Sequence, residues 1–195
     1  AGKVALVTGA ARGIGRAIAG KLAAQGCDVA VNYYNSADAA EELCAQIRAQ
    51  GRTAVAIQGS VGIPDSVDEM FEALRREFDH LVVSNAASGV LKPTTEMTLK
   101  HWRWCLETNA LALNLLVQRA LPLFREDARV IAMSSLGAQR AMPNYGFIGA
   151  SKAALDTMAM SLARVLGPEI RIIGVSPAGV DTDFVPGRSR DAVLK

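Results

Sequence analysis

Short apolar runs alternate with longer amphipathic segments along this chain. The apolar runs are rich in β-branched residues and predict strands at Lys3–Thr8, Asp28–Asn32, Thr53–Ile57, His80–Ser84, Arg129–Ser134 and Ile170–Ser176. The intervening segments predict helices near Gly13–Gln25, Asp38–Gln50, Asp65–Phe78, Leu99–Phe124 and Tyr145–Leu166. Pro122 is expected to bend or end the fourth helix. Because parallel strands need crossover helices of this kind, we predict an α/β domain with a doubly wound parallel sheet and helices on both faces.

Composition and charge argue against several classes of protein. Half of the 195 residues are apolar, and 21 basic against 19 acidic residues give a net charge of +2. This balance argues against nucleic acid or a membrane as a partner. Cys27, Cys44 and Cys105 follow no metal-ligand spacing, so we expect reduced thiols and no metal. The sequence has neither a long apolar run nor a leader pattern, and we expect a cytoplasmic protein.

Two of the predicted helices are more apolar than an ordinary surface helix. Residues 110–117 and 153–163 are mostly Ala, Leu and Met. A helix that is apolar nearly all round is buried on more than one side. We expect a partner subunit to cover these helices in a homodimer or homotetramer. The alternative is that a further C-terminal segment covers them.

A glycine-rich turn joins the first predicted strand to the first predicted helix. Its G-x-x-x-G-x-G pattern predicts a cofactor site formed by Gly9, Ala11, Arg12, Gly13, Ile14 and Gly15. Glycines let the backbone approach a pyrophosphate, and a helix N-terminus favours anionic charge. The pattern indicates a single Rossmann-type dinucleotide-binding domain over residues 1–195. The alternative is an ordinary glycine-rich turn between a strand and a helix.

Two features favour NADPH over NADH as the cofactor. The end of the second strand, residues 31–36, lacks the acidic residue that would accept the ribose 2′-hydroxyl of NADH. Arg12 lies inside the glycine turn, where its guanidinium could bind the 2′-phosphate of NADPH through charge-assisted hydrogen bonds. A solvated surface arginine is the alternative for Arg12.

Tyr145 and Lys152 suggest acid catalysis beside this nucleotide site. Six residues separate them; with three, both side chains would share one helical face, and that position holds Ile148. If the segment is helical, Tyr145 lies about 4.5 Å further along the axis than the carbonyl-reducing position. Conjugate reduction develops its negative charge two bonds further from the carbon that accepts the hydride than carbonyl reduction does. The offset therefore predicts reduction of a conjugated C=C bond.

Together these motifs resemble the short-chain dehydrogenase/reductase family across essentially the whole chain. The matching blocks are Thr8–Gly15, Asn85-Ala86-Ala87, Asn109, Met133-Ser134-Ser135, Tyr145 with Lys152, and Ser176-Pro177. Within the family, residues 84–93, residues 134–137 and the six-residue gap look like the enoyl-acyl-carrier-protein reductase III group. The resemblance implies further cofactor contacts from Ser60, Val61, Asn85, Ala86, Ala87, Lys152 and Pro177.

The resemblance also implies roles for four catalytic residues, each with a structural alternative. Tyr145 would stabilise an enolate or donate a proton, although it could merely cap a helix. Lys152 would hold the nicotinamide ribose and ease proton transfer, or it could be a solvated lysine. Ser135 would act as the catalytic serine or orient the substrate, or simply end a strand. Asn109 would bind a water or kink its helix, or be a satisfied buried amide.

The leading hypothesis is an NADPH-dependent enoyl thioester reductase. Its hydride would go to the β carbon of a trans-2-enoyl group carried by acyl carrier protein or coenzyme A, in fatty acid or polyketide biosynthesis. One alternative is a 3-oxoacyl or other carbonyl reductase that uses Tyr145 after a local rearrangement. Another is a non-catalytic NADPH-binding protein. Residues 178–195 are expected to form a mobile substrate loop, and we expect part of the domain to follow Lys195.

Overall fold

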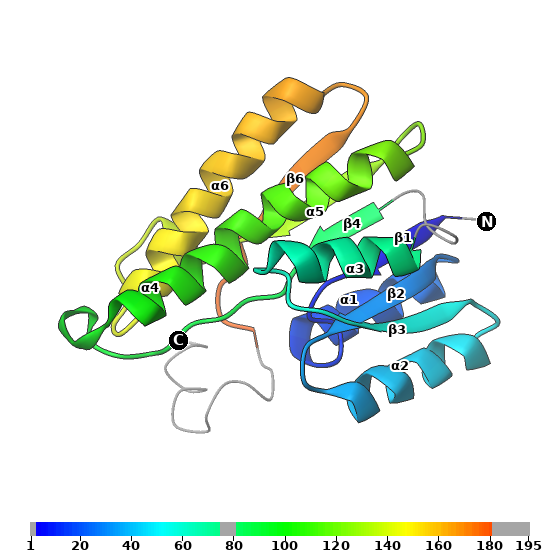
Figure 1. Cartoon of the computed structure of the whole chain (residues 1–195), viewed down its shortest axis with the longest axis horizontal. Coiled ribbons are helices and arrows are strands. Elements are labelled where there is room, and N and C mark those ends of the chain that lie inside the picture. Colours follow the sequence, from blue (N-terminus) through cyan, green and yellow to red (C-terminus); the bar gives the residue numbers. More distant parts are fainter. Residues whose placement is uncertain (1–2, 75–80, 181–195) are drawn as a thin grey trace.

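The computed structural model describes residues 3–74 and 81–180, and this part of the chain forms one six-stranded parallel sheet. The strand order is β3-β2-β1-β4-β5-β6 (Figure 1). The strands are β1 (Val4–Val7), β2 (Asp28–Tyr33), β3 (Ala54–Gln58), β4 (Leu81–Ser84), β5 (Arg129–Met133) and β6 (Arg171–Val175). The order reverses direction between β1 and β4, which creates a crevice at the carboxyl ends of these two strands. The predicted Rossmann-type doubly wound sheet is confirmed.

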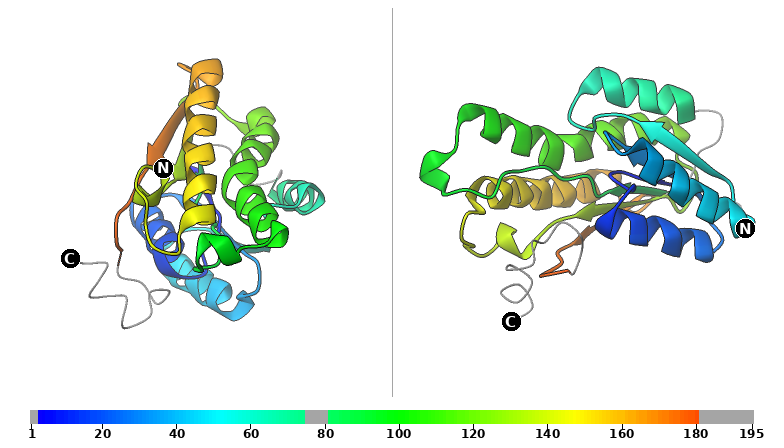
Figure 2. Two further views of the ribbon diagram at one scale, coloured as in Figure 1. Left: turned by 90° about the vertical axis from the view of Figure 1, so that its left-hand side faces the viewer. Right: turned by 90° about the horizontal axis from the view of Figure 1, so that it is seen from below.

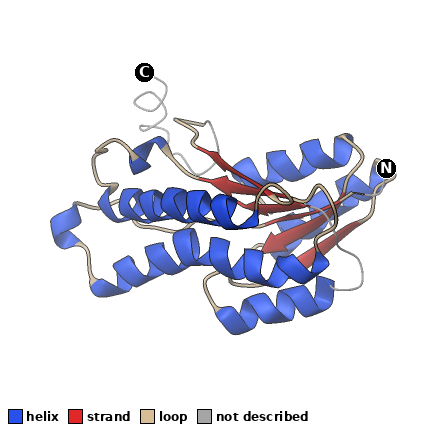
Figure 3. Ribbon diagram, turned by 90° about the horizontal axis from the view of Figure 1, so that it is seen from above, coloured by secondary structure: helices blue, strands red, loops and turns tan. Residues whose placement is uncertain are grey.

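The helices cover the two faces of the sheet, as the views in Figures 2 and 3 show. They are α1 (Gly13–Ala24), α2 (Ala37–Ala49), α3 (Pro64–Leu74), α4 (Leu99–Leu106), α5 (Ala112–Ala120) and α6 (Gly146–Leu166). Helices α1 and α2 pack on one face, in a cluster that includes Val31, Leu43 and Ile47. Helices α3, α5 and α6 pack on the other face around Leu116 and Leu155. Burial of both faces explains why the strands read as nearly continuous apolar runs.

The long helix predicted over Leu99–Phe124 contains a π-helical turn. A π-helical turn at Glu107–Leu111 separates α4 from α5, and a 3-10 turn at Leu121–Leu123 ends the segment at Pro122. The π turn contains Asn109, whose side chain bonds to a neighbouring loop instead of pointing to solvent. A single extra residue in the turn directs this amide into the interior. The predicted helix and its end near Pro122 are confirmed, and the π-helical turn at 107–111 is the irregular part within it.

The apolar character of the two unusual helices is largely explained within the chain. On α5 the buried residues are Ala112, Leu113, Leu115, Leu116, Val117 and Ala120, because this helix lies between α3 and α6 and against the sheet. On α6, Met160 and Val165 remain exposed, at 66% and 75%. A partner subunit would therefore cover fewer apolar side chains than the sequence indicated, among them Met160 and Val165. Oligomerisation stays a prediction.

Some predictions fall outside the described residues. These are the end of the third helix beyond Leu74, the strand start at His80, and residues 181–195 of the substrate loop. Within residues 3–74 and 81–180, no group of three or more His, Cys, Asp or Glu side chains could hold a metal ion. In the same ranges, none of the helices is both long and apolar enough to cross a membrane.

Candidate functional site

The glycine turn after β1 brings the backbone of helix α1 close to its neighbours. Gly9 and Gly13 have φ angles of +60° and +55°, in the left-handed region that favours glycine. A Cβ atom on Gly15 would lie 2.4 Å from the Gly9 carbonyl oxygen and 2.5 Å from Asn85 Nδ2. The three glycines thus keep the start of α1 against the turn and free of side chains. This geometry fits a pyrophosphate, which the helix N-terminus would stabilise.

Asn32, a buried residue of β2, fixes the turn from one side. Its Oδ1 atom accepts a hydrogen bond from the Gly9 N–H at 3.1 Å. Its Nδ2 atom donates to the carbonyl oxygens of Ile57 and Gly59 at 3.2 and 3.1 Å. One amide thereby links the ends of β1, β2 and β3. An unsatisfied amide would be costly at this buried position, and these contacts satisfy both of its ends.

Thr8 and Asn85 fix the turn from the other side. The Thr8 hydroxyl accepts hydrogen bonds from the backbone N–H groups of Asn85 and Ala86, both at 2.9 Å. Asn85 returns a bond from Nδ2 to the Thr8 carbonyl oxygen at 2.9 Å. The carboxyl ends of β1 and β4 are therefore joined at the crevice where the sheet order reverses. Asn85 and Ala86 lie beside the glycine turn, as the sequence predicted.

The remaining predicted cofactor residues follow the carboxyl ends of β1, β3, β4 and β6. Arg12 is the exposed N-cap residue of α1 and has no side-chain partner among the described residues. Ser60 donates its N–H to Ser66 Oγ at 2.9 Å, and Val61 is 4% exposed. Pro177 accepts a hydrogen bond from Leu136 N at 3.1 Å, next to Ser135. Ala11 is buried, Ile14 packs against the core, and Ala87 is exposed.

Tyr145 lies just outside the helix that carries Lys152. It is the N-cap residue of α6, with φ −111° and ψ 5°, and its phenol donates a hydrogen bond to Ser135 Oγ at 3.1 Å. Its ring lies against Gly137, where an added Cβ would come within 2.4 Å of Tyr145 Cε1. The predicted axial offset assumed a helical Tyr145, whereas the residue is the N-cap directly before α6, so the offset stays a prediction. From this position the phenol reaches Ser135.

Ile148 occupies the helical position four residues before Lys152 and offers no acid. Its side chain is buried and points toward Gly89, where an added Cβ would come within 2.3 Å of Ile148 Cγ1. The Cys105 thiol lies near the same glycine, and burial raises its pKa, which keeps the thiol protonated. Gly89 in the loop after β4, Cys105 of α4 and Ile148 of α6 thus form an apolar cluster. Among the described residues, Tyr145 is the phenol that contacts Ser135.

Lys152 is a buried cation at the carboxyl end of β5. Its Nζ atom donates to the Met133 carbonyl oxygen at 2.6 Å. Burial lowers the pKa of the Lys152 ammonium from 10.5 to about 8, and the Asp156 carboxylate opposes this shift. An ammonium has three donors, and the described residues supply a partner for one of them. The other two are available to the hydroxyls of a ribose, so the site fits a nucleotide sugar.

Asn109 ties the π turn to both the crevice and helix α6. Its Oδ1 accepts from the Ser88 N–H at 2.8 Å, and its Nδ2 donates to the Ser88 carbonyl and to Ser151 Oγ, each at 2.8 Å. Ser151 immediately precedes Lys152 and donates to the Ile148 carbonyl at 2.7 Å. The contacts make Asn109 a buried anchor for the helix that carries the lysine. Its predicted roles, in kinking the helix, binding a water or taking part in catalysis, stay predictions.

Three contributors were missed by reasoning from the sequence. Asn32 is a lone polar residue in an apolar strand, and that polarity was the signal that could have identified it. Ser151 was visible only as the neighbour of Lys152. Gly137 belongs to the family-like block 134–137, but its role depends on the way Tyr145 folds back over it.

The chain belongs to the short-chain dehydrogenase/reductase family. A family model described as enoyl-(acyl carrier protein) reductase matches residues 9–195. A hydroxynaphthalene reductase of Aspergillus fumigatus is 37% identical over 205 residues, which cover all of this chain and 75% of that protein. The match extends from the glycine turn through Lys152, so both parts of the site fall within it.

Solved structures agree with the fold and with the family. A short-chain dehydrogenase from Burkholderia cenocepacia, in complex with NADP, superposes with a TM-score of 0.93 at 37% identity, covering 98% of this chain and 80% of that one. A landomycin C-6 ketoreductase with bound NADP and rabelomycin gives a TM-score of 0.90 at 38% identity, covering 94% and 78%. The chain is therefore an oxidoreductase of this family. The landomycin protein is named a ketoreductase, which agrees with the carbonyl-reductase alternative better than with the leading enoyl hypothesis.

Proposed function

We propose that this protein is an NADPH-dependent carbonyl reductase that acts on a polycyclic or polyketide-like ketone. The observation that carries the proposal is the hydrogen bond from the Tyr145 phenol to Ser135 Oγ at 3.1 Å. Two hydroxyl groups in contact can both donate to one carbonyl oxygen between them, which is what reduction of C=O requires. The resemblance to a hydroxynaphthalene reductase and a landomycin ketoreductase supports the substrate class.

NADPH is the cofactor that the site fits best. The neighbouring structures from Burkholderia cenocepacia and of the landomycin ketoreductase contain NADP. In this chain, Gly9, Gly13 and Gly15 would hold the pyrophosphate, Arg12 would bind the 2′-phosphate and Lys152 would bind the nicotinamide ribose. The exposed Arg12 guanidinium has no competing partner among the described residues, and guanidinium binds phosphate through several parallel hydrogen bonds.

The protein side of the reaction follows from three side chains. When bound, NADPH supplies a hydride to the carbonyl carbon. Ser135 and Tyr145 hold the carbonyl oxygen, and the Tyr145 hydroxyl gives its proton to the alkoxide that forms there. The positive charge of Lys152 would favour loss of that proton, and its ammonium would hold the nicotinamide ribose through its hydroxyls. Solvent returns the proton to Tyr145 before the next turnover.

Reduction of an enoyl thioester is the second candidate. Ile148 stands at the helical position used for carbonyl reduction, and the matching family model is described as an enoyl-(acyl carrier protein) reductase. In this case Tyr145 would donate to the thioester oxygen of the enolate, and the substrate would be carried by acyl carrier protein or coenzyme A. The direct contact between Tyr145 and Ser135 favours the carbonyl reaction over this one.

Assembly and location complete the proposal. We infer a homodimer or homotetramer in which a second copy covers the exposed Met160 and Val165 on α6. The protein is expected in the cytoplasm, with its three cysteines reduced, and the described structure contains them as free thiols. Residues 178–195 are expected to cover the substrate.

Paired substrates test the proposed reaction. NADPH oxidation would be followed with a hydroxynaphthalene-derived ketone, a 3-oxoacyl thioester and a trans-2-enoyl thioester of matched chain length, and each product identified by mass. The carbonyl proposal expects turnover of a ketone or 3-oxo substrate and formation of an alcohol. Turnover of the enoyl thioester alone would contradict it and establish the second candidate. NADPH binding without turnover of any of the three would favour a non-catalytic role.

A further inference from the structure

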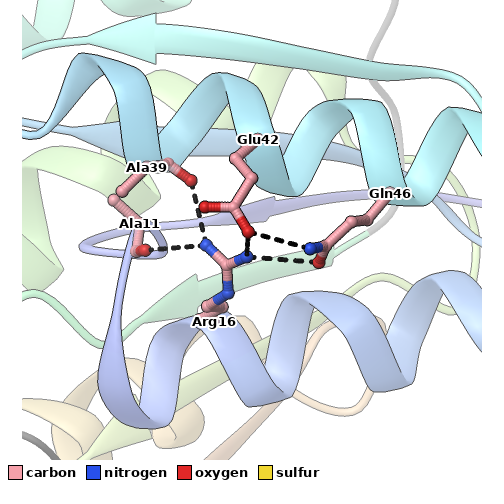
Figure 4. Close-up of polar contacts among 5 residues, drawn as sticks. All are labelled: Ala11, Arg16, Ala39, Glu42 and Gln46. Carbon is pink, nitrogen blue, oxygen red and sulfur yellow. Dashed lines mark hydrogen bonds and ion pairs between the residues drawn. The ribbon is translucent and has the colours of Figure 1, made fainter.

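Arg16 connects the glycine turn to helix α2. The residue lies in the first turns of α1, and its side chain points across to α2 (Figure 4). Its NH1 atom donates to the carbonyl oxygens of Ala11 and Ala39, at 3.4 and 3.0 Å. Its NH2 atom donates to Glu42 Oε1 at 2.9 Å and to Gln46 Oε1 at 3.2 Å. One guanidinium thus contacts the turn and two successive turns of a second helix.

Arg16, Glu42 and Gln46 form one connected hydrogen-bond network, in which Arg16 is more buried than Glu42. Glu42 and Gln46 are four residues apart, so they share one face of α2, and Gln46 Nε2 donates to Glu42 Oε1 at 3.0 Å. The Arg16 side chain is 27% exposed, whereas Glu42 is 63% exposed. A partly covered fork with four protein acceptors differs from an exposed ion pair, which holds little geometry.

The contact with Ala11 affects the residue that follows it. The Ala11 carbonyl and the Arg12 N–H belong to one planar peptide and point in opposite directions. A hydrogen bond from Arg16 to that carbonyl therefore directs the Arg12 N–H away from α2 and toward the opposite side of the turn. It also fixes the backbone from which the Arg12 side chain extends.

The contacts with α2 fix a second segment. Helix α2 begins at Ala37, directly after residues 34–36 at the carboxyl end of β2, where the adenosine ribose of a bound dinucleotide lies. The rest of the interface between α1 and α2 is apolar, with side chains such as Ile18, Ala40 and Leu43. Apolar contacts are non-directional, so the hydrogen bonds of Arg16 set how far the start of α2 lies from the glycine turn.

We propose that Arg16 is a positioning residue that sets the preference for NADPH over NADH. It holds Arg12 and the start of α2 at the separation that a ribose 2′-phosphate requires, without contacting that phosphate itself. The inference rests on the proposed cofactor. The role of Arg16 goes beyond that cofactor assignment, because it places specificity at a residue whose hydrogen bonds all go to the protein.

Two nucleotide fragments separate this role from general stabilisation. Calorimetry would measure the Kd of 2′,5′-ADP and of 5′-AMP for the wild type, Arg16→Met, Arg16→Lys and Glu42→Gln. Arg119→Met is the matched control, because Arg119 also bridges two helices, with a bidentate contact to Asp68, but on the opposite face of the sheet. Steady-state kinetics would give KM and kcat with NADPH and NADH, and thermal melting would confirm that each variant folds.

The expected result is a selective loss. In Arg16→Met the Kd of 2′,5′-ADP and the KM for NADPH rise about tenfold, a range typical of residues that act through others. The Kd of 5′-AMP, the KM for NADH and kcat at saturation stay within about twofold. Arg16→Lys follows the same direction, because one ammonium cannot reach all four acceptors, and Glu42→Gln shows a smaller effect. Arg119→Met leaves both fragments unchanged.

Three results would overturn the inference. Unchanged binding of both fragments in Arg16→Met and Arg16→Lys would leave Arg16 with a structural role alone. An equal loss for 2′,5′-ADP and 5′-AMP would mean that Arg16 supports the pyrophosphate turn and not the 2′-phosphate. Equal binding of the two fragments by the wild type would instead contradict NADPH as the cofactor. That last failure belongs to the proposed function and is visible before any variant is made.

Discussion

The two halves of the site are held by different kinds of contact. The nucleotide half, around β1, α1 and β2, consists of glycines with positive φ and buried amides that bond to backbone groups. The substrate half, around β5 and α6, depends on the side chains of Ser135, Tyr145 and Lys152. Tyr145 is the N-cap of α6, so the start of this helix sets where the phenol lies. The first half therefore tolerates little change in backbone, and the second tolerates little change in side-chain direction.

The two halves of the site are therefore constrained in different ways. A glycine turn that accepts a pyrophosphate has few alternatives, because φ and close packing both require the missing Cβ. A phenol can reach the same serine from more than one position in the chain. Here Tyr145 does so from outside α6, with Ile148 filling the helical position. The variants below are chosen to damage one half while the other stays intact.

The largest expected effect is the loss of the phenol. Tyr145→Phe should lower kcat about 10²- to 10⁴-fold, the range for a general acid, because the phenyl ring keeps the packing and loses the proton. The Kd of NADPH should stay unchanged, since Tyr145 contacts Ser135 and not the glycine turn. Rapid-reaction kinetics with the best ketone would measure kcat, and fluorescence quenching the Kd. A kcat within about threefold of the wild type would remove Tyr145 from the mechanism.

Gly137 allows the same contact to be disturbed without removing the phenol. In Gly137→Ala, the new Cβ would crowd Tyr145 Cε1, 2.4 Å away, so the ring must shift from Ser135. We expect a loss of kcat that approaches the loss in Tyr145→Phe. Normal turnover in Gly137→Ala would show that the packing against this glycine does not hold the phenol.

A methyl group added at Gly15 should weaken the binding of NADPH. The Cβ of Gly15→Ala would meet the Gly9 carbonyl and Asn85 Nδ2, so the turn must open and the Kd of NADPH should rise about 100-fold. Gly20→Ala is the matched control on the same helix, because nothing lies within 4 Å of its added Cβ. It should bind NADPH normally and gain up to about 1 kcal/mol in free energy of unfolding. Equal NADPH binding by the two variants would refute the close-packing account of the turn.

Asn109 joins the halves, and its loss should affect stability. Asn109→Ala removes hydrogen bonds to Ser88 and Ser151 and leaves buried groups unpaired, so the free energy of unfolding should fall by about 2–4 kcal/mol. Urea denaturation would measure the change. Asn114→Ala on α5 is the control, because the Asn114 side chain has no hydrogen bond among the described residues. It should change the free energy of unfolding by less than about 0.5 kcal/mol. Similar values for the two variants would mean that the π turn does not depend on Asn109.

The smallest effect concerns the buried cation of the substrate half. With a pKa of about 8 in the folded protein, Lys152 is charged at lower pH and loses its charge as the pH rises. The kcat/KM for NADPH should therefore fall about tenfold per pH unit above that value. The free energy of unfolding should instead rise between pH 8 and 10.5. In this range the lysine of the unfolded chain still binds the proton that the folded one has lost. Lys152→Met should abolish that rise in stability; if the rise persists, another group causes it.

Much of the fold and of the nucleotide half could be predicted from the sequence, because both follow from local rules. Apolar runs separated by crossover helices define a parallel sheet, and the spacing of Gly9, Gly13 and Gly15 indicates the turn that follows β1. The position of the Tyr145 phenol could not be predicted in this way. It depends on where α6 begins, and a shift of one residue at a helix end changes the side-chain direction completely. The form of the π turn at Asn109 could not be predicted for a similar reason, since it is stabilised by contacts with Ser88 and Ser151 from distant segments.

A double-mutant cycle on Tyr145 and Ser135 tests the central claim most directly. The kcat for ketone reduction would be measured for the wild type, Tyr145→Phe, Ser135→Ala and the double variant. If the two hydroxyls act as a unit on one carbonyl oxygen, the double variant should be no more than a few-fold slower than Tyr145→Phe, because effects within a unit are not additive. Losses that multiply, or a Ser135→Ala variant as fast as the wild type, would contradict the claim that Tyr145 acts together with Ser135.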